Sequence, residues 1–115
     1  MRRDMDLVRR ILLEVGDSDL PLDANALVTD EYPFEQVAYH IDLIGQAGLV
    51  WVDVSRMIGD RIVRAGIGPL TWEGNEYLDA IRDDTVWRRV KTRIAKTVGS
   101  ATIDTVIAHL RVDQW

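Results

Sequence analysis

Two histidines and a row of carboxylates are the side chains in this sequence whose types and spacing could do chemistry. His40 falls in a stretch with helical periodicity, and we interpret it as a partly buried histidine that hydrogen-bonds locally. His109 lies far along the chain and the sequence contains no cysteine, so no zinc site is expected. One acidic ridge at helical spacing, which we interpret as solvated surface instead of a divalent-ion site, consists of Glu73, Glu76, Asp79 and Asp83.

Motifs for nucleophilic catalysis and phosphate binding are missing from the sequence. No GxSxG, GxGxxG, HExxH or P-loop pattern occurs. Thr85 and Ser100 are interpreted as helix caps and not as nucleophiles. We therefore expect no enzymatic activity, no bound metal and no cofactor.

Composition predicts one soluble domain. The chain has 115 residues, of which 47% are hydrophobic and 29% charged. No apolar run approaches the roughly 18 residues that a membrane span needs. The first ten residues, MRRDMDLVRR, mix acids with arginines and contain no signal-peptide apolar core. We expect a protein of the bacterial cytoplasm without membrane contact.

Charge is distributed unevenly along the chain. The net charge is −5, and residues 11–55 hold nine acids without any lysine or arginine. Residues 82–111 hold seven cations against three acids. A basic protein surface would match the acidic interval, and a second copy of the chain could supply one by forming a homodimer.

The stretch from Pro33 to Val50 predicts a helix that runs into a strand. Its apolar stripe is Phe34, Val37, Ile41 and Ile44. Pro33 suits the start of a helix, and Gly48 suits a C′ residue with positive φ. This junction is typical of a recognition helix followed by a wing. The run VAYHIDLIGQAGLV, residues 37–50, resembles that segment of the arsenic-repressor-like (ArsR) bacterial regulators, and the resemblance implies a winged helix-turn-helix.

The segments before this helix predict a first helix and an ambiguous connection. Residues 4–15 predict a helix that Gly16 stops, with the stripe Met5, Val8, Ile11, Leu12 and Val15. Residues 17–32 are interpreted as a loop with a short extended piece near Ala26 to Thr29, paired with the wing. The alternative is one or two helical turns at Ala24 to Val28.

The segments after the helix predict a hairpin and further helices. Leu49 to Ser55 and Ile62 to Ile67 are expected as the wing strands, joined at Gly59-Asp60 and ended by Gly66, Gly68 and Pro69. We expect Thr71 to cap a helix from Trp72 to Arg82, with Trp72, Leu78 and Ile81 facing inward. Asp84 or Thr85 should begin the next helix, with the stripe Trp87, Val90, Ile94 and Val98. After a break at Gly99-Ser100, Thr102 should cap a last helix.

Three ordered stretches resemble a family of short phage and prophage proteins of unknown function. They are MRRDMDLVRRILLEV, EQVAYHIDLIGQAGLV and LTWEGNEYLDAIRDDTVWRRVK. The resemblance implies a winged-helix-like fold and assigns no residue a role. The predicted fold class is α+β and mainly helical. It is a single domain with a winged-helix-like core over 1–69, a degenerate or missing second helix, and C-terminal helices over 70–115.

The outer face of the recognition-like helix carries acids where DNA binding requires cations. That face is formed by Glu35, Tyr39, Asp42 and Gln46. Because affinity for a duplex comes largely from lysine and arginine, we interpret the face as either solvated or protein-binding. Phosphate contacts would have to come from a second set of residues, namely Arg56, Arg61, Arg64, Arg89, Arg93 and Lys96.

The leading hypothesis is a small non-enzymatic protein-interaction module that acts on nucleic-acid-handling machinery of the host or phage, as an inhibitor or regulator. The alternative is a DNA-binding transcriptional regulator of the winged-helix class, and a third possibility is a virion or assembly component. Trp51 and Trp115 would favour an interface if exposed. Trp51 could equally be covered by the C-terminal helices.

Overall fold

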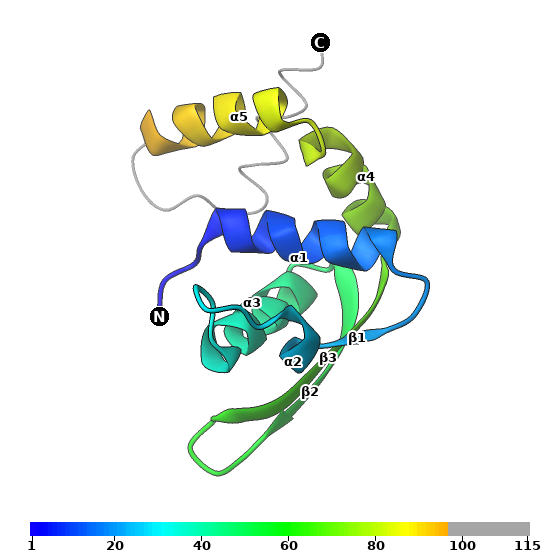
Figure 1. The fold of residues 1–115 in the computed structure, drawn as a ribbon, viewed down its shortest axis with the longest axis vertical. Coiled ribbons are helices and arrows are strands. Elements are labelled where there is room, and N and C mark those ends of the chain that lie inside the picture. Colours follow the sequence, from blue (N-terminus) through cyan, green and yellow to red (C-terminus); the bar gives the residue numbers. More distant parts are fainter. Residues whose placement is uncertain (97–115) are drawn as a thin grey trace. The chain divides into compact units, whose positions relative to one another are not determined.

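A computed structural model of the chain describes residues 1–96, except for the side chains of Val90 and residues 93–96 (Figure 1). The described part is an α+β structure with five helices and a three-stranded antiparallel sheet. Its elements are α1 (Met5–Asp17), β1 (Leu22–Asp23), α2 (Ala24–Leu27), α3 (Phe34–Gln46), β2 (Val50–Arg56), β3 (Ile62–Leu70), α4 (Trp72–Ile81) and α5 (Asp84–Lys96). Contacts divide the chain into two units, residues 1–75 and the remainder from Glu76. The predicted division at residue 69 stays a prediction.

The first helix, α1, begins at an aspartate cap and buries one apolar face. The Asp4 carboxylate accepts hydrogen bonds from the backbone N–H groups of Asp6 (3.0 Å) and Leu7 (3.2 Å). The helix continues one residue past Gly16, where we expected it to end. Met5, which we placed in the buried stripe, is only half-buried in the first turn. The buried residues of α1 are Leu7, Val8, Ile11, Leu12 and Val15.

Residues 17–32 contain a short strand and a short helix. Asp23 ends β1 and caps α2, because its Oδ1 accepts the Asn25 N–H at 3.0 Å. Ala24 and Leu27 are three residues apart and both buried, so one helical turn brings them to the same face. The extended piece expected near Ala26 to Thr29 is therefore wrong. The helical alternative is confirmed, and the extended piece that pairs with the hairpin is β1.

The sheet has the order β1-β3-β2, with β3 in the centre. In the hairpin Val52 pairs with Ile67 and Val54 with Ala65. The turn at Gly59-Asp60 is confirmed, since both residues have positive φ (87° and 67°). Three helices, α1, α2 and α3, contact the central strand β3. These contacts and the fully buried Leu7, Ile41 and Ile67 form the core of the first unit.

Strand β3 is longer than expected. Gly66, Gly68 and Pro69 were predicted to end it, but it runs on to Leu70. Gly66 pairs with both Asp23 and Asp53, so it lies in the middle of the sheet. Pro69 falls next to the register shift between Val50 and Val52, where a missing N–H is tolerated.

Thr71 caps α4, as predicted. Its Oγ1 accepts the Gly74 N–H at 3.0 Å and donates to the Gly48 carbonyl at 2.5 Å. At Gly74 an added Cβ would lie 1.8 Å from the Leu49 carbonyl oxygen, so a side chain is excluded there. Trp72 was expected to face inward and this is wrong, since it is 77% exposed.

In the second unit, Leu78 and Ile81 are buried, as expected, and so is Tyr77. Helix α5 begins at Asp84, which was one of the two predicted starts. Asp83 caps it in place of Thr85, because its Oδ1 accepts the N–H groups of Thr85 (2.8 Å) and Val86 (3.0 Å). These bonds lower the pKa of the Asp83 carboxyl. The helix predicted from Thr102, the break at Gly99-Ser100 and Trp115 lie outside the described residues.

Candidate functional site

The outer face of α3 presents the four predicted residues to different degrees. Glu35 and Gln46 are exposed, whereas Tyr39 and Asp42 are half-buried. The opposite face is buried against the core and consists of Val37, Ala38, His40, Ile41 and Ile44. Phe34, expected in the buried stripe, is half-buried at the first turn.

At the C-terminal end of α3 the acidic charge is compensated by the hairpin. Arg56 Nη2 donates to Asp42 Oδ2 at 2.6 Å, and Gln46 Nε2 donates to the same oxygen at 3.0 Å. Arg56 also donates to the Asp60 carbonyl at 3.0 Å. The structure therefore joins residues that we had assigned to two competing sites. Arg56 forms an ion pair with Asp42, so each charge partly neutralises the other and would attract a binding partner less strongly.

At the N-terminal end of α3 the acids are uncompensated. Asp30 and Glu31 lie in the loop before the helix, Glu35 lies in its first turn, and all three are exposed. Their carboxylates make no hydrogen bond or ion pair with any side chain or backbone group that the structure describes. Sequence reasoning included Asp30 and Glu31 in the acidic interval but named only Glu35 as a partner-binding residue. The loop places both acids ahead of Glu35 at the same end of the helix.

Behind these acids a buried polar cluster connects α1 to α3. His40 is fully buried, its Nε2 accepts the Asp4 N–H at 2.8 Å, and its Nδ1 lies 2.7 Å from the Gln36 carbonyl oxygen. Nε2 must therefore be unprotonated and Nδ1 must carry the proton, so the ring is neutral. Burial lowers the pKa of His40. The predicted local packing role is confirmed, with complete burial in place of partial burial.

Tyr32 completes this cluster. Its hydroxyl donates to Asp4 Oδ2 at 3.1 Å, so one aspartate both caps α1 and holds the loop before α3. Burial and the bond to Asp4 raise the pKa of the Tyr32 hydroxyl to about 12. The Tyr39 and His40 rings meet edge to face with centroids 5.4 Å apart. This arrangement fixes the start of α3, and it offers no nucleophile or general base to solvent.

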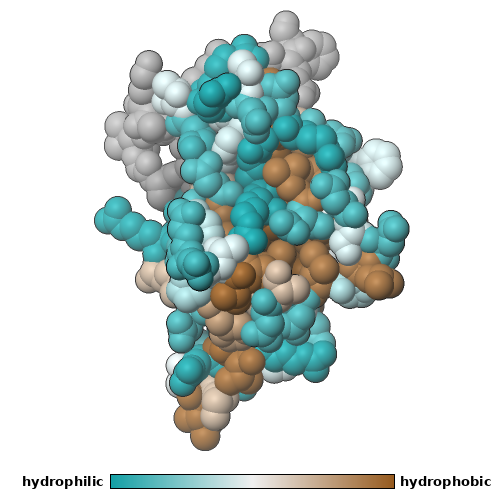
Figure 2. Space-filling view, in the orientation of Figure 1, coloured by the Kyte–Doolittle hydropathy of each residue, from teal (hydrophilic) through white to brown (hydrophobic). Residues whose placement is uncertain are grey.

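The end of the β2–β3 hairpin is apolar and basic. Met57 is 60% exposed and Ile58 is completely exposed, and the space-filling view shows apolar atoms at the bottom of the molecule, where the hairpin ends (Figure 2). Arg61 and Arg64 are exposed, and their side chains have no hydrogen-bond or ion-pair partner in the part of the chain that the structure describes. The predicted basic residues of the hairpin thus divide into one that is engaged and two that are free.

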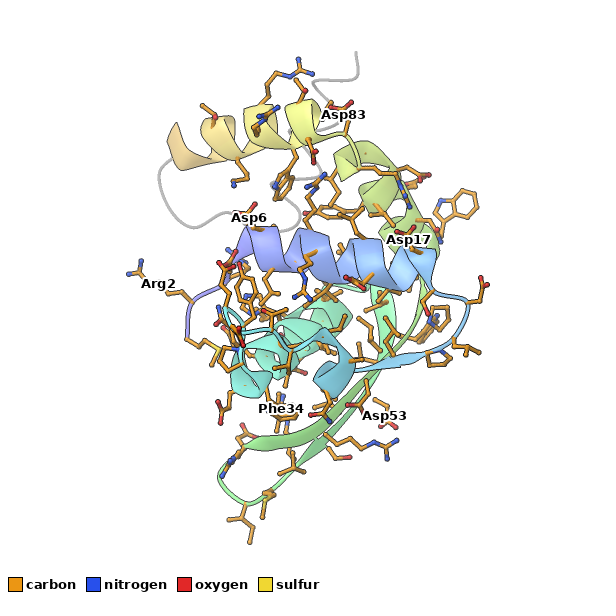
Figure 3. All side chains as sticks on the ribbon, in the orientation of Figure 1. Arg2, Asp6, Asp17, Phe34, Asp53 and Asp83 are labelled. Carbon is orange, nitrogen blue, oxygen red and sulfur yellow. The ribbon has the colours of Figure 1, made fainter. Side chains whose placement is uncertain are left out.

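The face of the sheet turned away from α3 contains a groove of about 420 Å³. Trp51 lies beside it and is 68% exposed, so of the two alternatives for this residue the structure selects exposure. Asp53 also lines it, projecting from β2 (Figure 3). Sequence reasoning missed the groove. The sequence feature that could have indicated it is the spacing of Gly66 and Gly68, because residues two apart in a strand lie on the same face.

In the second unit, Arg89 is exposed on α5. The side chains of Arg93 and Lys96, the other two predicted basic residues of this stripe, lie outside the described residues. No group of three potential metal ligands is found among the side chains that the structure describes. None of the helices within residues 1–96 is long and apolar enough to span a membrane.

The described residues form a small α+β structure with a three-stranded antiparallel sheet. Comparison with known families gives the particular family. Residues 2–101 match the family described as hypothetical protein (DUF2513), and the chain belongs to that family.

A relative from Haemophilus influenzae, described as an uncharacterized protein, is 33% identical over 109 residues. The match covers 92% of this chain and 89% of the relative. No solved structure matches the chain significantly.

Proposed function

We propose that this protein is a small non-enzymatic protein-interaction module with winged-helix architecture. The order α1, β1, α2, α3 and then the β2–β3 hairpin is the order of helices and strands in winged-helix domains. In this proposal α3 corresponds to the recognition helix and the hairpin to the wing. In this proposal α2 is a one-turn second helix, which agrees with the degenerate helix expected from the sequence.

The observation that carries the proposal is the charge at the start of α3. Helices that read DNA contact base edges with their N-terminal residues, which lie close to the phosphates. Here that end presents Asp30, Glu31 and Glu35 without a cationic partner in the described chain. Phosphates would be repelled, whereas a basic protein surface would be attracted and steered to this end of the helix.

Proteins that handle nucleic acids present the basic surfaces that such a helix end would fit. The resemblance to short phage and prophage proteins supports a target in the host or phage nucleic-acid machinery, which the module would inhibit or regulate. The bacterial cytoplasm is the proposed location, since that machinery resides there.

The test is affinity capture from a bacterial lysate by the full chain, comparing two charge reversals. Glu35→Lys should reduce recovery of the specific partner about tenfold, because one reversal both removes an attraction and adds a repulsion. Glu14→Lys, an exposed acid on α1, is the matched control and should leave recovery unchanged. Equal recovery of every captured protein by both variants would refute the proposal.

A second candidate function is DNA binding through the hairpin. The exposed Met57 and Ile58 resemble the apolar wedges that minor-groove proteins insert between base steps, and Arg61 and Arg64 are free to contact phosphates. This candidate predicts duplex binding that weakens steeply as salt rises. A gel shift that compares the wild type with Arg61→Gln tests this candidate, which predicts weaker binding by the variant. Absence of binding by the wild type at low salt would rule the candidate out.

A further inference from the structure

The outer groove of the sheet is built by residue alternation on three strands. Val52 points toward α3, because a Cβ added at Gly45 of α3 would meet the Val52 methyl groups. Its neighbours Trp51 and Asp53 therefore point to the opposite side. Gly66 pairs with Asp53 on one side and with Asp23 on the other, so these two acids lie on either side of a bare central strand.

Gly66 lies on the floor of this groove, and packing does not require a glycine at this position. A Cβ there would have only ordinary contacts, the nearest at 3.7 Å, and the φ of this residue is not positive. A side chain would therefore fit, and glycine in the middle of a strand lowers stability. At Gly68 the space is tighter, with the Trp51 carbonyl oxygen 3.3 Å from an added Cβ. Glycine at both positions leaves the groove empty between its walls.

The walls of the groove differ along its length. At the Gly68 end they are apolar, with Trp51 and Pro21 among the lining residues. At the Gly66 end they are charged, with Asp23 and Asp53 across the floor and Arg64 at the next position of β3 on the same face. Adjacent strands lie about 4.8 Å apart, so the backbones that carry these acids are separated by about 10 Å. That width accommodates one side chain between the two carboxylates.

The charges in the groove favour a single cation. Asp23 Oδ1 is occupied by Asn25, which leaves its second oxygen and both oxygens of Asp53 as acceptors. Arg64 also lines the groove, because it pairs with Ser55, two residues along β2 from Asp53. The lining therefore carries two acids and one cation, and its net charge of −1 matches one further cation. A planar guanidinium forms paired hydrogen bonds with carboxylates. The aromatic ring of Trp51 can contact either a cation or an apolar side chain.

We propose that this groove binds one arginine side chain of a protein partner, with the guanidinium between Asp23 and Asp53 and a neighbouring apolar residue against Trp51. The inference rests on the proposed function only in that the partner is a protein. It concerns the face of the sheet opposite α3, so the two surfaces can be tested separately.

The test is a titration of the isotope-labelled full chain with the blocked peptide N-acetyl-Ala-Leu-Arg-Ala-amide, followed by NMR. We expect shifts of the Trp51 indole N–H and of the Gly66 and Gly68 amides. The same peptide with citrulline in place of arginine keeps the shape and loses the charge, and it should bind about tenfold more weakly. Equal affinity for the two peptides, or shifts confined to residues 30–42, would overturn the proposal.

Variants sharpen this test. Gly66→Thr fills the floor with a residue that strands favour, and should abolish the shifts without lowering the melting temperature. Asp53→Asn should weaken the arginine peptide about tenfold, whereas Asp79→Asn, an exposed acid of α4, should not. An unchanged affinity in Asp53→Asn contradicts the proposal.

The two proposals fail in different experiments. Glu35→Lys should leave the peptide affinity unchanged, because Glu35 belongs to α3 and does not line the groove. Loss of lysate capture by Glu35→Lys together with equal binding of the two peptides would retain the proposed function and reject the groove. Unchanged lysate capture by Glu35→Lys together with tighter binding of the arginine peptide would retain the groove and reject the proposed function.

Discussion

The two ends of α3 carry the same kinds of residues but meet their surroundings differently. At the C-terminal end Asp42 is held by Arg56 at 2.6 Å and by Gln46 at 3.0 Å. At the N-terminal end Glu35, with Asp30 and Glu31 ahead of it, has no partner among the described residues, while His40 is sealed beneath the surface as a neutral ring. The uncompensated negative charge of this helix is therefore concentrated at its N-terminal end.

This asymmetry has a simple cause. The hairpin returns past the last turns of α3 and brings a cation that is 14 positions away from Asp42 in sequence. Among the described residues no cation pairs with the acids at the first turn, where the loop before α3 adds two more acids. The start of the helix is instead fixed from within, by the cluster of Asp4, Tyr32 and His40.

The largest expected effect comes from removing that internal cluster. His40→Leu keeps most of the volume but leaves the Asp4 N–H without its acceptor, so we expect a loss of about 2–3 kcal/mol in the free energy of unfolding. Urea denaturation followed by circular dichroism measures it. His40→Gln, which can supply an acceptor, should lose less. A change below about 0.5 kcal/mol in His40→Leu would show that the cluster does not stabilise the helix start.

The pH dependence of stability is the next effect. The pKa of His40 is lowered in the folded state, so the unfolded chain binds the extra proton first as pH falls. Its contribution is complete above the unfolded pKa of about 6.5 and is lost as pH falls from there toward the folded pKa, with a slope of at most about 1.4 kcal/mol per pH unit.

The free energy of unfolding, measured by urea denaturation at a series of pH values in this range, should therefore change more with pH for the wild type than for His40→Gln. An NMR titration of His40 with a pKa above 6.5 would contradict the assignment of a neutral, acceptor ring.

The smallest effect belongs to the other end of the helix. Asp42 and Arg56 are both partly solvated, so a double-mutant cycle of Asp42→Asn and Arg56→Gln should give a coupling of about 0.5 kcal/mol that falls with salt. Glu35→Gln paired with Arg56→Gln is the control and should show none. Coupling at Glu35 as large as at Asp42 would remove the contrast between the two ends.

Local features of this fold could be predicted from sequence because neighbouring residues decide them. The limits of α3, the turn at Gly59-Asp60 and the cap at Thr71 all follow from apolar spacing, glycine and short polar side chains. The predictions that failed depended on distant partners. Gly66 and Gly68 indicate the end of a strand when considered alone, yet pairing with β1 and β2 keeps β3 extended through them.

The candidate sites show the same division. The sequence alone determined that residues 11–55 are acidic and without cations, that α3 has an outer polar face, and that the hairpin carries arginines. Only the tertiary structure decided that Arg56 neutralises Asp42, that Trp51 and Trp72 are exposed, and that two glycines form the floor of a groove between Asp23 and Asp53. The physical reason is that charge pairing, burial and grooves depend on distances between elements, which the packing of the chain sets.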